Sequence, residues 1–162
     1  MGQSASTKDK NNVIIQGIPD HIRMDKIVLA FVGKGETGKS SLIERFILEA
    51  VPNKKYATNE ITHCTKVIYI NGKPITFEIW DTPGQGFYGQ KYDCIKKAQG
   101  IFACFDISTK ASFKAIQEWV IEGPKFVNEA AQILLVGTRA DMQSYREVST
   151  LEAKIGRASC RE

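Results

Sequence analysis

A glycine-rich loop constrains the fold of this chain more than any other feature: Gly33-Lys34-Gly35-Glu36-Thr37-Gly38-Lys39-Ser40. It fits the phosphate-binding pattern G-x-x-x-x-G-K-[ST] at every fixed position. An apolar run, Ile27–Val32, precedes the loop, and apolar residues at helical spacing follow it at Leu42, Ile43, Phe46 and Ile47. The pattern therefore predicts a loop between a buried strand and a helix, where phosphate meets backbone N–H groups and a helix N-terminus.

The residue types in this loop suit a nucleotide's phosphate chain. Glycines let the backbone wrap a phosphate without Cβ clashes. Lys39 would add a positive charge near the β- and γ-phosphates, and Ser40 would offer its hydroxyl to Mg²⁺. The alternative is a chance glycine-rich turn, which the flanking strand and helix disfavour. The residues expected to contact the nucleotide here are Gly33, Gly35, Glu36, Thr37, Gly38, Lys39, Ser40 and Ser41.

A second polar segment, Asp81-Thr82-Pro83-Gly84-Gln85-Gly86, directly follows the expected strand Pro74–Trp80. An acidic residue at the end of a strand is the expected Mg²⁺ partner in a phosphate-loop protein. The alternative is a plain turn, because Asp, Pro and Gly all favour turns. Beside the phosphate loop, the sequence favours Asp81 as a metal ligand.

Strands and helices alternate along the chain, which predicts a mostly parallel sheet covered on both faces by helices. Strands are expected at Lys26–Val32, Thr62–Ile70, Pro74–Trp80, Gly100–Phe105 and Gln132–Val136. Helices are expected at Lys39–Ala50, Gln90–Lys97 and Lys110–Ile121, with one more opening at the capping box of Ser149 and Glu152. The fold class is thus a three-layer α/β phosphate-loop domain.

The dipeptide Asn71-Gly72 predicts one antiparallel hairpin at the edge of this sheet, because both residues accept a positive φ. Pro74, at the start of the second hairpin strand, fits an edge position. On the helix Lys110–Ile121, one broad face is expected to pack in the core: Phe113, Ile116, Trp119, Val120 and Ile121.

Composition limits the class of protein. The chain has 162 residues, enough for one domain with a proper core. Its net charge of +4 allows weak attraction to anionic membrane but does not argue for nucleic acid. Its four cysteines form no C-x-x-C pair, which favours reduced thiols in the cytoplasm. No apolar run is long enough to cross a bilayer, and no signal peptide is visible.

Both ends of the sequence differ from the middle. Residues 1–24 are expected to form a flexible extension, and Gly2 fits the signature for N-terminal myristoylation, with Lys8 and Lys10 nearby. The alternative is a polar leader without lipid; one myristoyl chain binds membrane only marginally, so a second signal would be needed. Residues 155–162 lack apolar periodicity and look like translated sequencing-adapter read-through. We expect them to be non-native, and residues 25–154 to be an incomplete domain of a longer protein, truncated at its C-terminus.

With these pieces placed, the chain resembles the Ras superfamily of small GTPases, and its Rab branch most closely. The phosphate loop is one of the motifs that carry the resemblance. The others are Trp80-Asp81-Thr82-Pro83-Gly84-Gln85, Phe105-Asp106-Ile107-Ser108 and Leu134-Leu135-Val136-Gly137-Thr138-Arg139-Ala140-Asp141. Their order and spacing imply the G domain of this family and the ligands GTP, GDP and Mg²⁺.

The resemblance implies roles for residues that the phosphate loop alone does not identify. Spacing from Ser40 and from Asn71-Gly72 places the family's switch threonine at Thr58, as a ligand of Mg²⁺ and the γ-phosphate. Gln85 would orient the attacking water, and Gly84 would contact the γ-phosphate. The implied catalytic residues are Gln85, Lys39 and Thr58, and the implied metal ligands are Ser40, Thr58 and Asp81. The implied base-contacting residues are Thr138, Arg139 and Asp141.

Some residues depart from the family pattern. Thr138 replaces asparagine. Arg139 replaces lysine; it keeps the positive charge, and its guanidinium plane can stack on a purine. Asn59-Glu60 replaces the Rab Ile-Gly after the switch threonine. Three departures put nucleotide affinity or hydrolysis in doubt: Val51, Pro83 and Gly86.

The resemblance implies a GTP-binding and GTP-hydrolysing switch of membrane traffic or signalling, with slow intrinsic hydrolysis, at the cytosolic face of a membrane. An exchange factor, an activating protein and effectors would bind the loops Lys54–Ile61 and Thr82–Lys91. The departures keep open a GTP-binding scaffold that does not cycle. A third reading, an ATP-using phosphotransferase, is disfavoured by Asp141, whose carboxylate suits guanine.

Overall fold

A computed structural model of the chain describes residues 12–13, 26–49, 58–84 and 93–158. Its strands are β1 (Asn12–Val13), β2 (Lys26–Val32), β3 (Thr62–Ile70), β4 (Lys73–Asp81), β5 (Gly100–Asp106) and β6 (Gln132–Thr138). Its α-helices are α1 (Lys39–Leu48), α2 (Asp93–Lys97), α3 (Lys110–Glu122) and α4 (Thr150–Ala158), and short 3-10 helices cover Gly123–Phe126 and Gln143–Tyr145.

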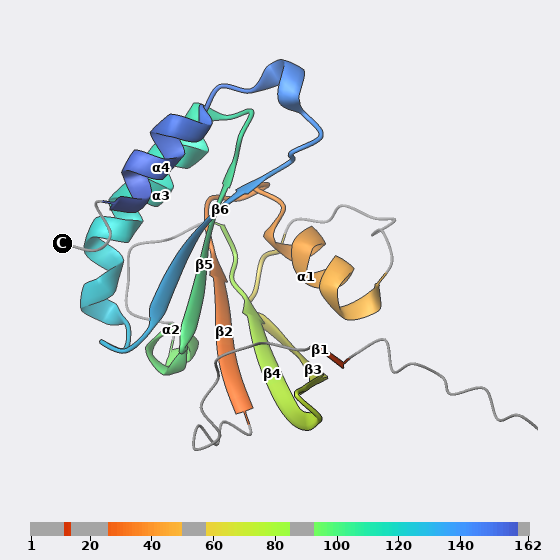
Figure 1. Cartoon of the computed structure of the whole chain (residues 1–162). Helices are drawn as coiled ribbons and strands as arrows, with labels where there is room; N and C mark the ends of the chain where they lie inside the picture. The colour runs from red at the N-terminus through yellow and green to blue at the C-terminus, as the bar shows by residue number, and fades with distance from the viewer. Residues whose placement is uncertain (1–11, 14–25, 50–57, 85–92, 159–162) are drawn as a thin grey trace, which may run out of the picture.

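The strands form one sheet in the order β1-β3-β4-β2-β5-β6. Strands β3 and β4 pair antiparallel, whereas the other pairs between described strands are parallel. This confirms the expected fold class. Because β4, β2, β5 and β6 run in the same direction, their carboxyl ends meet at one edge of the sheet (Figure 1). That edge carries the phosphate loop.

The hairpin turn has the expected chemistry, with φ of 51° at Asn71 and 77° at Gly72. The edge position expected for Pro74 needs a correction, because β4 lies inside the sheet between β3 and β2. Pro74 pairs with Tyr69 on β3, but the pairing of β4 with β2 begins only at Thr76. Proline therefore removes no hydrogen bond to β2, and it is tolerated for the same reason as at an edge.

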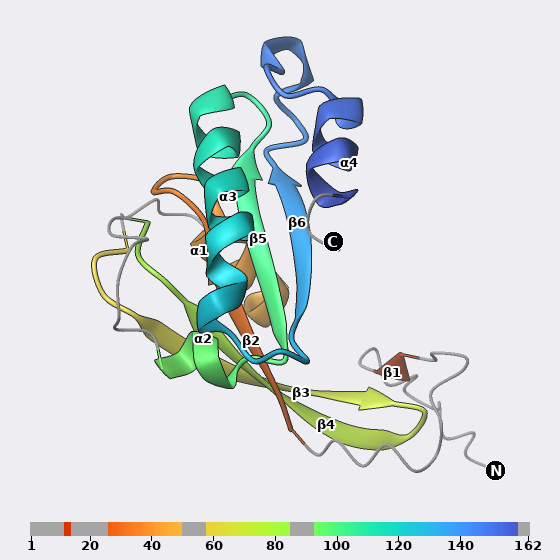
Figure 2. The ribbon, with the colours of Figure 1, turned by 90° about the vertical axis from the view of Figure 1, so that its left-hand side faces the viewer.

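The helices cover both faces of the sheet, giving three layers (Figure 1). One core joins the sheet to α2 and α3 and includes Ile95, Phe113 and Ile116. The other joins it to α1 through Phe31, Ile43, Ile79 and Cys104. Figure 2 shows α3 lying along β5 and α4 beside β6. No described helix has the length and apolar character needed to cross a membrane.

Three details differ from the expectations. Ile121 is 63% exposed, because the core face of α3 is filled by the preceding turn, including Trp119 at 7%. Helix α1 ends at Leu48, since the next residue, Glu49, adopts a left-handed φ of 56°. Helix α4 begins at the expected capping box, where Ser149 Oγ accepts the Glu152 N–H at 3.0 Å, and it runs to Ala158, beyond the expected domain end at 154. That residues 155–162 are non-native stays a prediction.

Candidate functional site

The phosphate loop begins where β2 ends, and its shape depends on glycine. Gly33 has a φ of +150°, and a Cβ built there would lie 2.3 Å from the carbonyl oxygen of Cys104 on β5. Such an approach excludes every other residue at this position. Gly38, at φ +82°, then turns the chain into α1. The loop therefore lies in close contact with β5, and Gly33 and Gly38 determine the direction of its backbone at its two ends.

The Lys39 side chain lies inside the loop. Its residue is 4% exposed, and its Nζ donates to the carbonyls of Gly33 at 3.0 Å and Lys34 at 3.1 Å. Burial lowers the pKa of Lys39, while the nearby Asp81 carboxylate acts in the opposite direction. An ammonium has three N–H donors, so these carbonyls account for two of them. The position suits a cation that also contacts a phosphate held by the loop.

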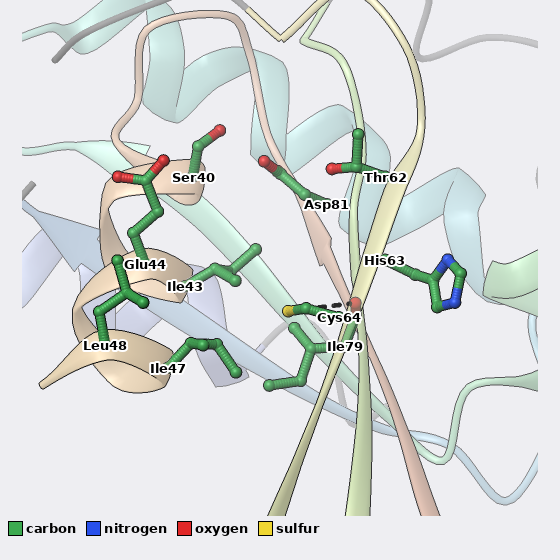
Figure 3. A pocket seen from close by; sticks show the side chains of 10 residues that line it. All are labelled: Ser40, Ile43, Glu44, Ile47, Leu48, Thr62, His63, Cys64, Ile79 and Asp81. Atoms are coloured by element: carbon green, nitrogen blue, oxygen red, sulfur yellow. Dashed lines mark hydrogen bonds between the residues drawn. The ribbon is translucent and has the colours of Figure 1, made fainter.

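The three expected metal ligands lie together. The hydroxyl oxygens of Ser40 and Thr58 are 2.7 Å apart, and Thr58 Oγ1 lies 3.4 Å from Oδ2 of Asp81. Figure 3 shows Ser40 and Asp81 on facing elements, α1 and β4. Burial raises the pKa of Asp81, opposed by hydrogen bonds from Ser40 and Thr58 and by the charge of Lys39.

One oxygen of this cluster lacks a partner. Asp81 Oδ1 is buried and accepts no hydrogen bond from any described residue. A buried, unpaired carboxylate oxygen is costly unless a ligand satisfies it. Two hydroxyls and a carboxylate are hard oxygen ligands of the kind that Mg²⁺ prefers. The cluster therefore fits a magnesium ion. No group of three or more His, Cys, Asp and Glu side chains in the described segments forms another metal site.

The segment after β4 also reaches the phosphate loop. Thr82 Oγ1 donates to the carbonyl of Phe31 on β2 at 2.7 Å. Two residues later, a Cβ built on Gly84 would lie 1.9 Å from the backbone nitrogen of Gly35. Only glycine allows this approach, so the structure brings Gly84 to the loop as expected.

Two of the residues expected to contact the base also contact the phosphate loop: Thr138, which ends β6, and Arg139, which follows it. Thr138 Oγ1 lies 2.6 Å from the carbonyl oxygen of Thr37 and 2.9 Å from that of Phe105. Arg139 donates to the carbonyl of Glu36 at 2.9 Å, and its Nη1 lies 3.2 Å from Oδ2 of Asp106. Thr138 and Arg139 thus hold the phosphate loop.

Asp141 lies just beyond these contacts in an exposed turn after β6. The contact of Arg139 with Asp106 was not foreseen from the sequence. The available signal was the acidic residue at the carboxyl end of β5, the strand that pairs with both β2 and β6.

Several expected features lie outside the described residues. They include the proposed catalytic Gln85, the lipid acceptor Gly2, and the departures Val51 and Gly86. Parts of the two expected switch loops, residues 54–57 and 85–91, lie outside as well. Of the expected 1–24 extension, only β1 is described, and it pairs with Tyr69 and Ile70 at the end of β3.

A cavity of about 240 Å³ adjoins the metal-ligand cluster. Ser40 and Asp81 line its polar end, and Ile43 and Ile79 belong to its apolar wall. Figure 3 shows that the Cys64 side chain points toward α1. The cavity therefore lies between α1 and the β3–β4 hairpin, beside the cluster.

The fold and this site define a phosphate-loop α/β domain. Residues 26–160 match the model of the Ras family, and the chain belongs to that family, the small GTPases, as a Rab-like member. Ras-related protein Rab-11A of Dictyostelium discoideum is 34% identical over 134 residues, covering 80% of this chain and 60% of the relative. Ras-related protein Rab-12 of Mus musculus is 31% identical over 125 residues, covering 76% and 51%.

A much longer relative also matches. EF-hand calcium-binding domain-containing protein 4B of Homo sapiens is 29% identical over 153 residues, which is 91% of this chain but 19% of that protein. The chain spans between half and two thirds of the length of the two Rab relatives above.

Proposed function

We propose that this protein binds GTP and GDP with Mg²⁺ and hydrolyses GTP slowly, acting as a Rab-like switch in membrane traffic or signalling. The observation that carries the proposal is the convergence of Ser40, Thr58 and Asp81 beside the buried Lys39, with one carboxylate oxygen unpaired. Family membership supports GTPase activity in general, and the site residues support it in this chain.

Each residue has a distinct part in the proposed reaction. The loop from Gly33 to Ser41 would bind the phosphates through its N–H groups, and Lys39 would offset the charge that grows on the γ-phosphate. Ser40, Thr58 and Asp81 would hold the metal, which when bound supplies positive charge to the β- and γ-phosphate oxygens. Gln85 would orient the attacking water, with an arginine supplied by an activating partner.

The nucleotide base would be selected after β6. The Asp141 carboxylate would accept hydrogen bonds from the ring N–H and amino group of guanine, which adenine cannot reproduce. Arg139 would stack on the purine while it holds the loop. We therefore propose a preference for guanosine over adenosine nucleotides.

The γ-phosphate would be sensed by Thr58 and Gly84, which approach the loop from two segments. Ordering of residues 54–61 and 82–91 around it would create the surface that exchange factors, activating proteins and effectors read. Myristoylation of Gly2 would place this surface at the cytosolic side of a membrane. Mass spectrometry of the N-terminal peptide, from cells that express the chain, tests that part: an unmodified glycine would remove it.

The competing function is a scaffold that binds GTP without cycling. Pro83 favours it, because proline removes a backbone N–H and stiffens the segment that leads to Gly84. The switch and the scaffold predict different rates of GTP hydrolysis, so a measurement of that rate separates them.

The test uses fluorescent GDP and ADP analogues with the purified chain, with Mg²⁺ and with EDTA, followed by phosphate release from GTP. We expect GDP to bind more tightly than ADP, more tightly with Mg²⁺, and hydrolysis to fall in Gln85→Leu. Lys125→Gln, which removes an exposed ion pair with Glu122 on α3, is the control. Equal and negligible hydrolysis in wild type and Gln85→Leu would favour the scaffold. Absence of binding, or a preference for ADP, would refute the proposal.

A further inference from the structure

Thr58 lies near the middle of a chain segment whose two ends are joined by Lys66. The segment begins in the last turn of α1 and finishes inside β3. Lys66 Nζ donates to the carbonyl of Phe46 at 2.6 Å and to Oε1 of Glu49 at 3.0 Å, across 20 and 17 positions of the chain. One ammonium therefore connects the helix that precedes Thr58 to the strand that follows it.

Lys66 reaches α1 because of its position in β3. Successive strand residues point to opposite faces of the sheet, so Lys66 shares a face with Cys64, two positions earlier. Figure 3 shows the Cys64 side chain pointing toward α1. The Lys66 side chain is 15% exposed, and its Nζ lies 4.9 Å from the centre of the Phe46 ring. A carbonyl, a carboxylate and an aromatic ring thus hold the ammonium against the last turn of the helix.

The end of α1 offers an acceptor for this charge. The last four carbonyls of a helix lack the regular partner within it, and the Phe46 carbonyl is one of them. A positive charge near these carbonyls is favourable. Glu49 then leaves the helix with a left-handed φ of 56°, and its N–H donates to the carbonyl of Arg45 at 3.1 Å. Lys66 therefore fixes the point at which the chain leaves α1 on its way to Thr58.

We propose that Lys66 is a positioning residue for Thr58, the residue assigned above to Mg²⁺ and the γ-phosphate. Because Lys66 joins the two ends of the segment, less chain has to be ordered when Thr58 meets Ser40 and Asp81. The entropy lost on ordering a loop grows with its length. Binding of a nucleotide with a γ-phosphate should gain most, since GDP offers Thr58 no such group. GTP as the ligand rests on the proposed function, whereas the placement of Thr58 can be tested without a nucleotide.

The ratio of the affinities for a GTP analogue and for GDP, both with Mg²⁺, tests the effect on binding. In Lys66→Met this ratio should fall about threefold, the factor expected when the length of an unconstrained loop doubles. The affinity for GDP should stay close to that of the wild type, because the phosphate loop is unchanged. Lys66→Arg keeps a charged donor for the Phe46 carbonyl and should restore the ratio. Methionine preserves the packing of the lysine stem, so Lys66→Met should fold.

Ile116→Val is the control for a loss of stability alone. Ile116 is fully buried in the core that joins the sheet to α2 and α3, whereas α1 belongs to the other core. Removal of one buried methyl group should destabilise the protein measurably. Because this core does not contact the segment around Thr58 through Lys66, the ratio should stay at the wild-type value.

Disulfide trapping measures the placement of Thr58 in the chain without nucleotide or metal. The hydroxyl oxygens of Ser40 and Thr58 are 2.7 Å apart, so Ser40→Cys and Thr58→Cys together should form a disulfide with oxidised glutathione. The rate reports the effective concentration of one thiol at the other. Addition of Lys66→Met should slow trapping about threefold, for the same reason of loop length, and addition of Lys66→Arg should not. Peptide mass spectrometry distinguishes this bridge from others.

Three results would decide against Lys66. An unchanged affinity ratio or an unchanged trapping rate in Lys66→Met would show that Thr58 is placed without the lysine. An equal fall of the ratio in Ile116→Val would show that lost stability, and not positioning, is the cause. If the wild type bound no guanine nucleotide, the proposed function would fail, and the trapping rate alone would decide whether Lys66 positions Thr58.

Discussion

Lys66 of β3 fixes the end of α1, and its removal should measurably destabilise the protein. Its Nζ donates to the carbonyl of Phe46 at 2.6 Å, pairs with Glu49 at 3.0 Å, and lies 4.9 Å from the centre of the Phe46 ring. The Lys66 side chain is 15% exposed, whereas that of Glu49 is 61% exposed. The charge-assisted bond to the helix end therefore matters most.

The expected magnitude follows from these contacts. A charged donor at the carbonyl end of a helix contributes about 1.5 kcal/mol. The cation–π contact adds about 0.5 kcal/mol, and the exposed ion pair about 0.3 kcal/mol. Because Met preserves most of the packing of the lysine stem, Lys66→Met should lower the free energy of unfolding by about 2 kcal/mol. In a protein of this size, that corresponds to about 4–8 °C in Tm.

Urea unfolding followed by circular dichroism checks this value, with Lys125→Met as the control. Lys125 also pairs with a glutamate, Glu122, at 2.6 Å, but both side chains are at least half exposed. The control should change stability by less than about 0.5 kcal/mol. If Lys66→Met matched the control, the contact with the end of α1 would contribute no net stability. Glu49→Gln should also cost less than about 0.5 kcal/mol, since most of the effect is assigned to the helix carbonyl.

Three further outcomes are expected. Gly84→Ala places a Cβ on the backbone of Gly35, so the preference for a GTP analogue over GDP should fall at least about tenfold, with an unchanged circular dichroism spectrum. If the variant kept the preference, the close approach of Gly84 to Gly35 would be contradicted. Asp81→Asn should weaken nucleotide binding about tenfold or more with Mg²⁺ but not with EDTA, and an equal loss in both conditions argues against a metal ligand. Burial raises the pKa of the Cys104 thiol to about 12. At pH 8, iodoacetamide should therefore label the half-buried Cys64 well before Cys104, which peptide mass spectrometry can follow.

The sequence predicted best those features that depend on neighbouring residues. The phosphate loop between β2 and α1 and the turn at Asn71-Gly72 are specified by local backbone preferences, and Asn71 and Gly72 have the expected positive φ values. The buried face of α3 followed from helical spacing, except at Ile121, because spacing alone does not show how wide the core contact is. The position of Thr58 beside Ser40 followed from the resemblance to a known family.

Long-range contacts were not predictable from local patterns. Asp106 looked like the end of a strand, and only the pairing of β5 with β2 and β6 shows that it meets Arg139. Pro74 was assigned to an edge because proline lacks an N–H, but the sequence does not show where β2 begins opposite β4. The pairing of β1 with β3 had no sequence signal beyond a short apolar run.

The hydroxyl that holds the Thr37 carbonyl comes from Thr138, 101 positions later in the chain. During synthesis, the phosphate loop therefore leaves the ribosome long before β6, and its contact with Thr138 forms only after β6 has joined the sheet. A ligand that binds only the completely folded domain stabilises full-length chains and not nascent ones. Nucleotide in the cell would in this way favour molecules that have completed folding.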